Sequence, residues 1–451
     1  MRTTTRTITG WITTTATALA VAGLTPPAAT AAGPASITSA LGATATAPVA
    51  DCPASRWVAA WTASPTDGSV PFDPSLGAVP TSLTDQTVRM VISPHVGGAS
   101  LRLHLSNRFG NAPVAFGRVT VGLQEQGGPA VGDPRPVTFS GAESVTVPGG
   151  RDVVSDPVAL TFSAFTPLSV SIYLPKSTTA VTKHWNANAT SYYSDQGAGD
   201  LSTQTSGARF TNRTLSWLFV DGLDVMAPAR AIAAFGDSIT DGFVGGSPLS
   251  IPADRSAADK NGRYPDDLQR RATDAGRAIS VVNAGIGSNQ LLGSLGLMDG
   301  PSGLSRFQAD ALDIPGAGGI IVLEGINDLG LGSGVTPTQL QAGYTRLIGK
   351  AHASGKKIWL GTITPAANAL IDGTATAPNS ENYRQQVNAW IRGQALADGV
   401  IDFDAALRDP AHHSQLLPEY ASPDNLHPSL RGYQKMADAV PLDLLEQVPC
   451  A

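Results

Sequence analysis

The hydrophobic and polar positions change their pattern near residue 226. Before that point, short apolar runs alternate with turn sequences, and Leu101-Arg-Leu-His-Leu105 alternates apolar and polar residues strictly, as a half-buried strand does. Comparable runs occupy 88–93, 158–162 and 168–174. Many short strands separated by turns predict a β-sandwich or jelly roll over residues 51–226.

After residue 230 the pattern is that of alternating strands and helices. Apolar runs predict strands at 231–235, 278–282, 319–324, 357–363 and 400–403. Helices are expected at 337–352, 380–397 and 430–446. The start of the first helix is the best marked, because Thr336 and Gln339 form a capping box around Pro337. This order predicts a parallel sheet with helices on both faces over residues 231–445.

One serine lies where such a sheet binds its ligands. The apolar run from Ala231 ends abruptly in Gly236-Asp237-Ser238-Ile239. In open α/β sheets, ligands bind at the carboxyl ends of the strands, and the next helix directs unpaired backbone N–H groups there. Ser238 is therefore placed to act as a nucleophile, although a plain turn would have the same sequence.

Other segments supply the partners that a nucleophilic serine needs. Asp424 precedes His427 by three residues, and prolines flank both, so the two side chains can serve one site. A serine needs an adjacent base, and the base needs an orienting carboxylate. The segments 283–289 and 325–328 each follow an apolar run of their own and are expected at the same crevice.

In this order, the four segments resemble the SGNH (GDSL) hydrolases, over roughly residues 231–445. The resemblance implies a flavodoxin-like three-layer α/β/α fold, and the preceding β-domain is similar to one that some members carry. It also implies Ser238 as nucleophile, His427 as base and Asp424 as the residue that orients the base.

The resemblance further implies an oxyanion hole. Its donors would be the backbone N–H of Ser238, a backbone N–H in the second segment and the side-chain amide of Asn327. The family usually has glycine at the second donor position, whereas here Ser288 occupies it and Gly287 comes one residue early. We expect Ser288 to be the donor, with Gly287 as the alternative.

Further residues near these segments have expected supporting roles. Asp237 should brace the serine turn, with orientation of the base as an alternative, and Asp328 should anchor the loop of Asn327. We expect His412 and His413 in a loop at the entrance. The Gly-, Ser- and Pro-rich loop 242–262 is expected to shape the pocket.

The N-terminal residues have the pattern of an export signal. Arg2 and Arg6 precede a weakly apolar stretch, and small residues follow it, which predicts a signal peptide over 1–32. A low-complexity leader is expected at 33–50. Because no later segment reaches ~18 uninterrupted apolar residues, we expect no stable membrane insertion. The export signal predicts a secreted, extracellular protein, which we expect to be a monomer.

Charge and cysteine content bear on nucleic-acid binding and on disulfide formation. From 30 basic and 36 acidic residues, removal of Arg2 and Arg6 leaves a net charge of −8, which disfavours nucleic-acid binding. The two cysteines, Cys52 and Cys450, lie near the ends of the expected folded region. Export permits a disulfide, and we expect the two to pair, with free thiols as the alternative.

The sequence lacks the motifs of several other chemistries. We find no His-Glu-x-x-His stretch, no phosphate-binding glycine loop and no Gly-x-Ser-x-Gly elbow, so no cofactor or metal is expected. The leading hypothesis is an esterase acting on acetyl, feruloyl or short-chain esters, as small molecules or attached to polysaccharides. The alternatives are a lipase or phospholipase-type acylhydrolase, an acyltransferase, and a glycan-binding protein with a degenerate hydrolase domain.

Overall fold

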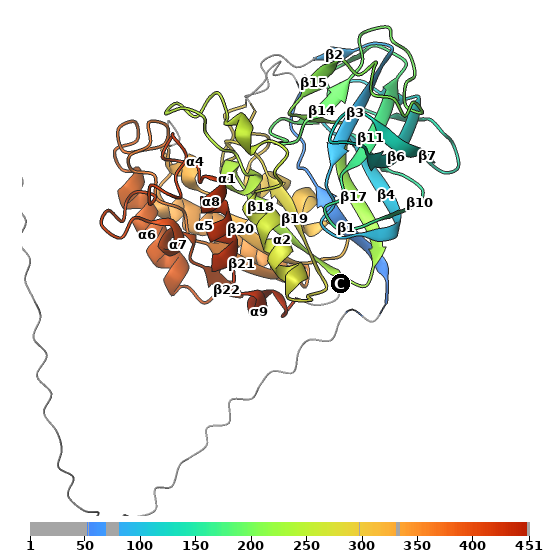
Figure 1. The fold of residues 1–451 in the computed structure, drawn as a ribbon. Helices are drawn as coiled ribbons and strands as arrows, with labels where there is room; N and C mark the ends of the chain where they lie inside the picture. The colour runs from blue at the N-terminus through green and yellow to red at the C-terminus, as the bar shows by residue number, and fades with distance from the viewer. Residues whose placement is uncertain (1–51, 53, 69–80, 297, 331–333, 449–451) are drawn as a thin grey trace, which may run out of the picture. The chain divides into compact units, whose positions relative to one another are not determined.

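The computed structural model describes residues 52, 54–68, 81–296, 298–330 and 334–448. The described residues between 54 and 227, here called the β region, contain two large antiparallel sheets (Figure 1). The first sheet has the order β1 (Arg56–Thr62), β17 (Val220–Ala227), β4 (Gly98–Asn107) and β10 (Val158–Phe162), with β9 (Arg151–Val154) beside β4. The second has the order β15 (Asn212–Thr214), β14 (Ser191–Tyr193), β3 (Gln86–Ile92), β11 (Leu168–Leu174), β6 (Arg118–Gln124) and β7 (Val131–Val137).

Three short strand pairs complete the described part of the β region. They are β2 (Ser82–Leu83) with β12 (Thr178–Thr179), β5 (Val114–Phe116) with β8 (Val145–Val147), and β13 (Lys183–His184) with β16 (Trp217–Leu218). In β4, Leu101, Leu103 and Leu105 are buried while the residues between them are partly exposed. The alternation expected from the sequence is confirmed, and so is the expected antiparallel β structure of this region.

A parallel sheet follows in residues 230–448, here called the α/β region. Its strand order is β19 (Ile279–Gly285), β18 (Arg230–Gly236), β20 (Ala317–Leu323), β21 (Lys357–Gly361) and β22 (Gly399–Ile401). The first strand in the chain, β18, lies second in the sheet, which is the flavodoxin-like order. The chain therefore continues from β18 to β19 on one side and later adds β20, β21 and β22 on the other. A crevice is expected at the carboxyl end of β18, where the direction of strand order reverses.

Two groups of helices pack with this sheet. One group contains α2 (Tyr264–Asp274), α7 (Phe403–Leu407) and α8 (Leu430–Ala439), and the other contains α3 (Gly303–Phe307), α5 (Pro337–Ala353) and α6 (Ser380–Gly393). Shorter turns are α1 (Ser238–Asp241), α4 (Ile326–Leu329), α9 (Leu442–Leu445), the 3-10 turn η1 (Arg255–Ala257) and the π turn η2 (Gln308–Leu312). The predicted fold class is therefore confirmed.

The helix boundaries differ from expectation in two places. The start of α5 is as predicted, since Thr336 N–H donates to Gln339 Oε1 at 2.8 Å. Helix α6 ends at Gly393 rather than 397, because the Gln394 side chain accepts the N–H groups of Leu396 and Ala397 and turns the chain. The last predicted helix is interrupted after Ala439 by Pro441, which cannot continue it.

The two regions meet along β1 and β19, which pack against each other. Ala59 of β1 accepts a hydrogen bond from Ser280 Oγ at 2.6 Å, and Thr62 Oγ1 donates to the carbonyl of Asn283 at 2.6 Å. These bonds hold the β region beside the strand whose end carries the second predicted segment of the site.

Several predictions lie outside the described residues. The signal peptide (1–32), the leader (33–50) and Cys450 are among them, so export and the pairing of Cys450 with the buried Cys52 stay predictions. The change from antiparallel to parallel strands falls between β17 and β18, at the boundary expected from the sequence pattern; the division into domains also stays a prediction. Among the described helices, none is long and apolar enough to cross a membrane.

Candidate active site

The turn after β18 holds Ser238 at the start of a helix. Asp237 is the N-cap of α1, and its side chain accepts the N–H of Ile239 at 2.9 Å. A Cβ on Gly236 would come under 3.0 Å from Thr240 and from the Leu323 carbonyl, so the strand end admits only glycine. Asp237 therefore braces the serine turn, as expected, and burial raises its pKa to about 7.

Ser238, His427 and Asp424 are joined by hydrogen bonds. The Ser238 hydroxyl lies 2.8 Å from His427 Nε2, and His427 Nδ1 lies 2.7 Å from Asp424 Oδ2. All three side chains are buried. With Nδ1–H donating to the carboxylate, Nε2 presents its lone pair to the hydroxyl. The sequence predicted this grouping from segments almost 190 residues apart.

The surroundings of Asp424 favour its charged form. Its Oδ1 accepts from the Ser422 hydroxyl at 2.7 Å and from the N–H groups of Leu426 and His427 at 3.0 Å each. Burial acts to raise the pKa of Asp424, but the charge of His427 and these hydrogen bonds together hold it well below its ordinary value. The carboxylate is therefore a fixed acceptor for the imidazole.

The predicted oxyanion donors lie at the same cleft. Ser238, Ser288, Asn327 and His427 are among its lining residues. Asn327, on α4, uses one amide hydrogen to donate to the Asn289 carbonyl at 2.8 Å, which leaves the other hydrogen available. Ser288 has φ of 61°, a left-handed conformation that glycine adopts far more readily than serine.

Asp328 ties the loop of Asn327 to the chain just after the second segment. Its carboxylate accepts the N–H groups of Leu291 and Leu292 at 2.7 and 2.9 Å. Burial raises the pKa of Asp328 to about 6 in spite of these bonds. The expected anchoring role is confirmed, and the bonds run to residues that directly follow the segment carrying Ser288.

A buried arginine that was not predicted from the sequence links the strand ends. The Arg306 guanidinium donates to the carbonyls of Gly236 and Ala284 at 2.7 Å each and to Asn289 Oδ1 at 2.8 Å. It also lies 3.1 Å from Glu324 Oε1. Glu324 could have been noticed as a carboxylate that directly follows a buried strand, whereas nothing near Arg306 in the sequence marks it.

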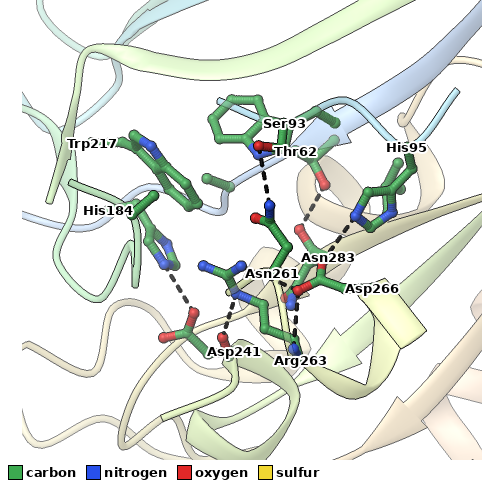
Figure 2. A pocket seen from close by; sticks show the side chains of 14 residues that line it. Thr62, Ser93, His95, His184, Trp217, Asp241, Asn261, Arg263, Asp266 and Asn283 are labelled. Atoms are coloured by element: carbon green, nitrogen blue, oxygen red, sulfur yellow. Dashed lines mark hydrogen bonds and ion pairs between the residues drawn. The ribbon is translucent and has the colours of Figure 1, made fainter. Parts of the chain in front are cut away.

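The helix that carries Ser238 is also held from the β region. Asp241, the last residue of α1, lies 3.0 Å from His184 Nε2 and accepts from Asn186 Nδ2 at 3.0 Å. Arg263 donates to the Asp241 backbone carbonyl at 2.9 Å. Figure 2 shows His184 and Arg263 directed at Asp241, beside the cavity that they line. None of these residues was given a role from the sequence alone.

The cleft above Ser238 measures about 210 Å³ and has mostly apolar walls. Loop 242–262 contributes Phe243, Leu249 and Ile251, which confirms that this loop shapes the pocket. One wall residue, Trp185, comes from the β region. His412 and His413 are not among the lining residues. His412 pairs with Asp409 on an exposed loop, so the expected loop position is confirmed, whereas a place at the entrance of the cleft stays a prediction.

Comparison with known proteins assigns part of this chain to a family. Residues 234–435 match the GDSL-like Lipase/Acylhydrolase family. No curated protein matches the chain.

Similar solved structures include a putative lipolytic protein of the G-D-S-L family from Desulfitobacterium hafniense, with 21% identity over 46% of this chain and 96% of that one, at a TM-score of 0.34. A carbohydrate acetylesterase from Sinorhizobium meliloti is 16% identical over 47% of this chain and 95% of its own, at a TM-score of 0.38. An aryl esterase from M. smegmatis is 16% identical over 47% of this chain and 96% of its own, also at a TM-score of 0.38. Similarities at this level of identity and TM-score do not indicate the substrate of this chain. The match assigns residues 234–435 to the GDSL-like lipase/acylhydrolase family, a family of carboxylic-ester hydrolases.

Proposed function

We propose that the chain is a secreted serine esterase that hydrolyses carboxylic esters through an acyl-enzyme. The observation that carries the proposal is the unbroken hydrogen-bond chain from Asp424 through His427 to Ser238, at a cleft that Asn327 and Ser288 also line. Acyl transfer to water requires a nucleophile, a base, a carboxylate that orients the base, and hydrogen-bond donors beside the nucleophile.

In the first half-reaction, Ser238 Oγ attacks the ester carbonyl carbon while His427 Nε2 takes the hydroxyl proton. The bond from carbon to the alcohol oxygen then breaks, and the proton passes from Nε2 to the leaving alcohol. A water molecule attacks the acyl-enzyme by the same route, and the carboxylic acid leaves with Ser238 restored. Asp424 stays ionised throughout and holds the imidazole in the required tautomer.

The negative charge on the carbonyl oxygen needs fixed donors during both attacks. We propose the N–H groups of Ser238 and Ser288 and the free amide hydrogen of Asn327. The ties made by Asp328 and Arg306 hold these donors without rearrangement. Donors that are preorganised in this way commonly contribute more to the rate of acyl transfer than any other single feature of an active site.

The cleft favours a short acyl group. Its walls are mostly apolar, which suits a hydrocarbon or aromatic acyl group better than a sugar. Its volume of about 210 Å³ is below the ~300–1,000 Å³ of pockets for drug-sized ligands. We therefore propose acetyl, short-chain or feruloyl esters, with the alcohol, such as a carbohydrate, outside the cleft.

A lipase is the second candidate, and exposed apolar side chains support it. Leu249, Ile251, Leu295 and Leu370 are between 45% and 63% exposed and lie on the loops that supply the cleft walls. Exposed apolar groups around a binding cleft are expected where a protein meets a lipid surface. Export remains part of the proposal and rests on the sequence of residues 1–32; recovery of the shortened chain from the culture medium tests it.

The direct test is hydrolysis of p-nitrophenyl acetate, butyrate, octanoate and palmitate by the purified protein and by its Ser238→Ala variant. We expect activity to fall with chain length and to be lost in the variant. A rise toward palmitate would favour the lipase, and release of alkyl ester when an alcohol competes with water would favour an acyltransferase. Activity that survives in Ser238→Ala would contradict the mechanism, and a folded but inactive wild type would favour the glycan-binding hypothesis.

A further inference from the structure

One wall of the cleft comes from outside the matched family domain. Trp185 belongs to the β region, yet it lines the cleft together with Ser238, Ser288 and His427. Its indole Nε1–H donates to the Met298 carbonyl at 3.0 Å. Its ring centroid lies 6.2 Å from that of Phe243, which in turn lies 4.8 Å from the His427 ring. The indole is thus part of the apolar wall of the cleft that holds the reacting groups.

The neighbours of Trp185 in the chain fix it in this position. His184 lies 3.0 Å from one carboxylate oxygen of Asp241, and Asn186 donates to the other at 3.0 Å. Asp241 ends the helix that begins with Ser238. His184 also bonds through Nδ1 to the Ser64 carbonyl at 2.9 Å. The segment 184–186 is therefore anchored to the nucleophile's helix on both sides of the indole.

The second segment of the site has a glycine where the indole passes. A Cβ on Gly287 would come under 3.0 Å from three atoms of the Trp185 ring, which is closer than a packed core tolerates. Ser288, the next residue, takes the left-handed conformation and lines the cleft. The glycine thus serves the approach of Trp185, and this explains why it stands one residue before the expected donor.

We propose that Trp185 is a specificity-determining residue and that the β region is, through it, a part of the ester-binding site. The inference rests on the proposed esterase function. The alcohol must leave toward His427, which protonates it, whereas Trp185 lies against the loop that carries the proposed donor Ser288. The indole therefore bounds the space for the acyl group and limits its length.

The test compares wild type, Trp185→Ala and Trp185→Phe on p-nitrophenyl acetate and octanoate, with kcat and KM measured separately. Trp185→Ala should raise the octanoate-to-acetate ratio of kcat/KM by roughly tenfold or more, the scale on which pocket contacts discriminate acyl groups. Trp185→Phe should change the ratio less. Trp57→Ala is the matched control, because Trp57 packs under Arg102 in the β region and is not among the residues that line the cleft.

A uniform loss on both esters by folded Trp185→Ala would overturn the proposal. So would an unchanged ratio, or a shift seen only when the alcohol is varied in a series of acetate esters. If Trp185→Ala does not fold, the ratio measured with Trp185→Phe decides, and an unchanged ratio there counts against the proposal. Inactive wild type or active Ser238→Ala would instead contradict the esterase function itself.

Discussion

The β region and the α/β region bring side chains to the cleft in different ways. In the α/β region, Ser238, Ser288 and Asn327 follow the carboxyl ends of three neighbouring parallel strands, β18, β19 and β20. In the β region, Trp185 follows the short strand β13, and its place depends on bonds to Asp241 in the other region.

This difference indicates what each part of the site depends on. The strand ends of one sheet meet at one edge whatever surrounds them, so the catalytic groups depend mainly on ties inside the α/β region. The bonds of His184 and Asn186 to Asp241 add one tie from the β region to the helix of Ser238. The wall formed by Trp185 depends on packing between the two regions. Changes to the first should affect stability and turnover, whereas changes to the second should affect stability and ester preference.

The largest expected effect is on the internal tie of the α/β region. Arg306→Ala should lower the free energy of unfolding by about 3–5 kcal/mol, because it leaves Glu324 as a buried carboxylate without its cation. Urea denaturation measures this. The control is Arg118→Ala, which breaks a pair with Glu143 exposed on both sides and should cost about 1 kcal/mol or less. Equal losses of unfolding free energy in the two variants would contradict the proposed role of Arg306.

The second prediction concerns turnover. Asn327→Ala should lower kcat by ~100- to 1,000-fold with little change in KM, because the lost amide acts on the oxyanion and not on the bound ester. Steady-state kinetics on p-nitrophenyl acetate measures both constants. Asn382→Ala, on the exposed face of α6, should leave them unchanged. A rise in KM at constant kcat would assign Asn327 to substrate binding instead.

The third prediction tests the contact between the regions. Gly287→Ala should lower the free energy of unfolding by about 1–3 kcal/mol through overpacking against the indole. The loss should shrink when Trp185 is also replaced by alanine, and a double-mutant cycle measures the coupling. Gly349→Ala in α5, where no atom lies within 4 Å of the added Cβ, should be neutral or stabilising. Strict additivity of the two site substitutions would refute the contact.

The smallest expected effect depends on pH. Burial acts to lower the pKa of His184, but the charge of Asp241 and the hydrogen bonds to Asp241 and Ser64 raise it overall, against the opposing charge of Arg263. A raised pKa means that the contribution to stability is complete below pH ~6.5 and is lost as the pH rises through the folded-state value.

His184→Gln should therefore lower the free energy of unfolding more at about pH 5.5 than at about pH 9, with a difference on the order of 1 kcal/mol. Urea denaturation at the two pH values measures it. Asn382→Ala, on the exposed face of α6 and without a titratable group, is the control and should change the free energy of unfolding equally at the two pH values. A larger loss at the higher pH would mean that the pair is neutral in the folded protein.

Much of the fold and the catalytic grouping could be predicted because their signals are local. The strands at 158–162 and 168–174 were predicted to the residue, since alternation and turns define them. Ser238 and Asn327 were found because strand ends are visible in the sequence. The helix ends at Gly393 and Ala439 were missed because a side-chain bond from Gln394 and the position of Pro441 outweighed the hydrophobic pattern.

Residues whose roles arise from packing could not be predicted. Arg306 acts through carbonyls of strands that lie far from it in the sequence, and Trp185 acts through a surface formed when the two regions meet. The early glycine at 287 was noticed as a departure from the family pattern. Its reason, the approach of the Trp185 ring, requires the three-dimensional structure.

The central claim is that His427 and Asp424 activate Ser238 as a nucleophile. A fluorophosphonate, which forms a covalent bond with activated serines, followed by proteolysis and mass spectrometry, tests this most directly. The account predicts a single adduct on the peptide that contains Ser238, absent from Ser238→Ala and strongly slowed in His427→Ala. An adduct on another serine, or an esterase that remains active and unlabelled, would contradict it.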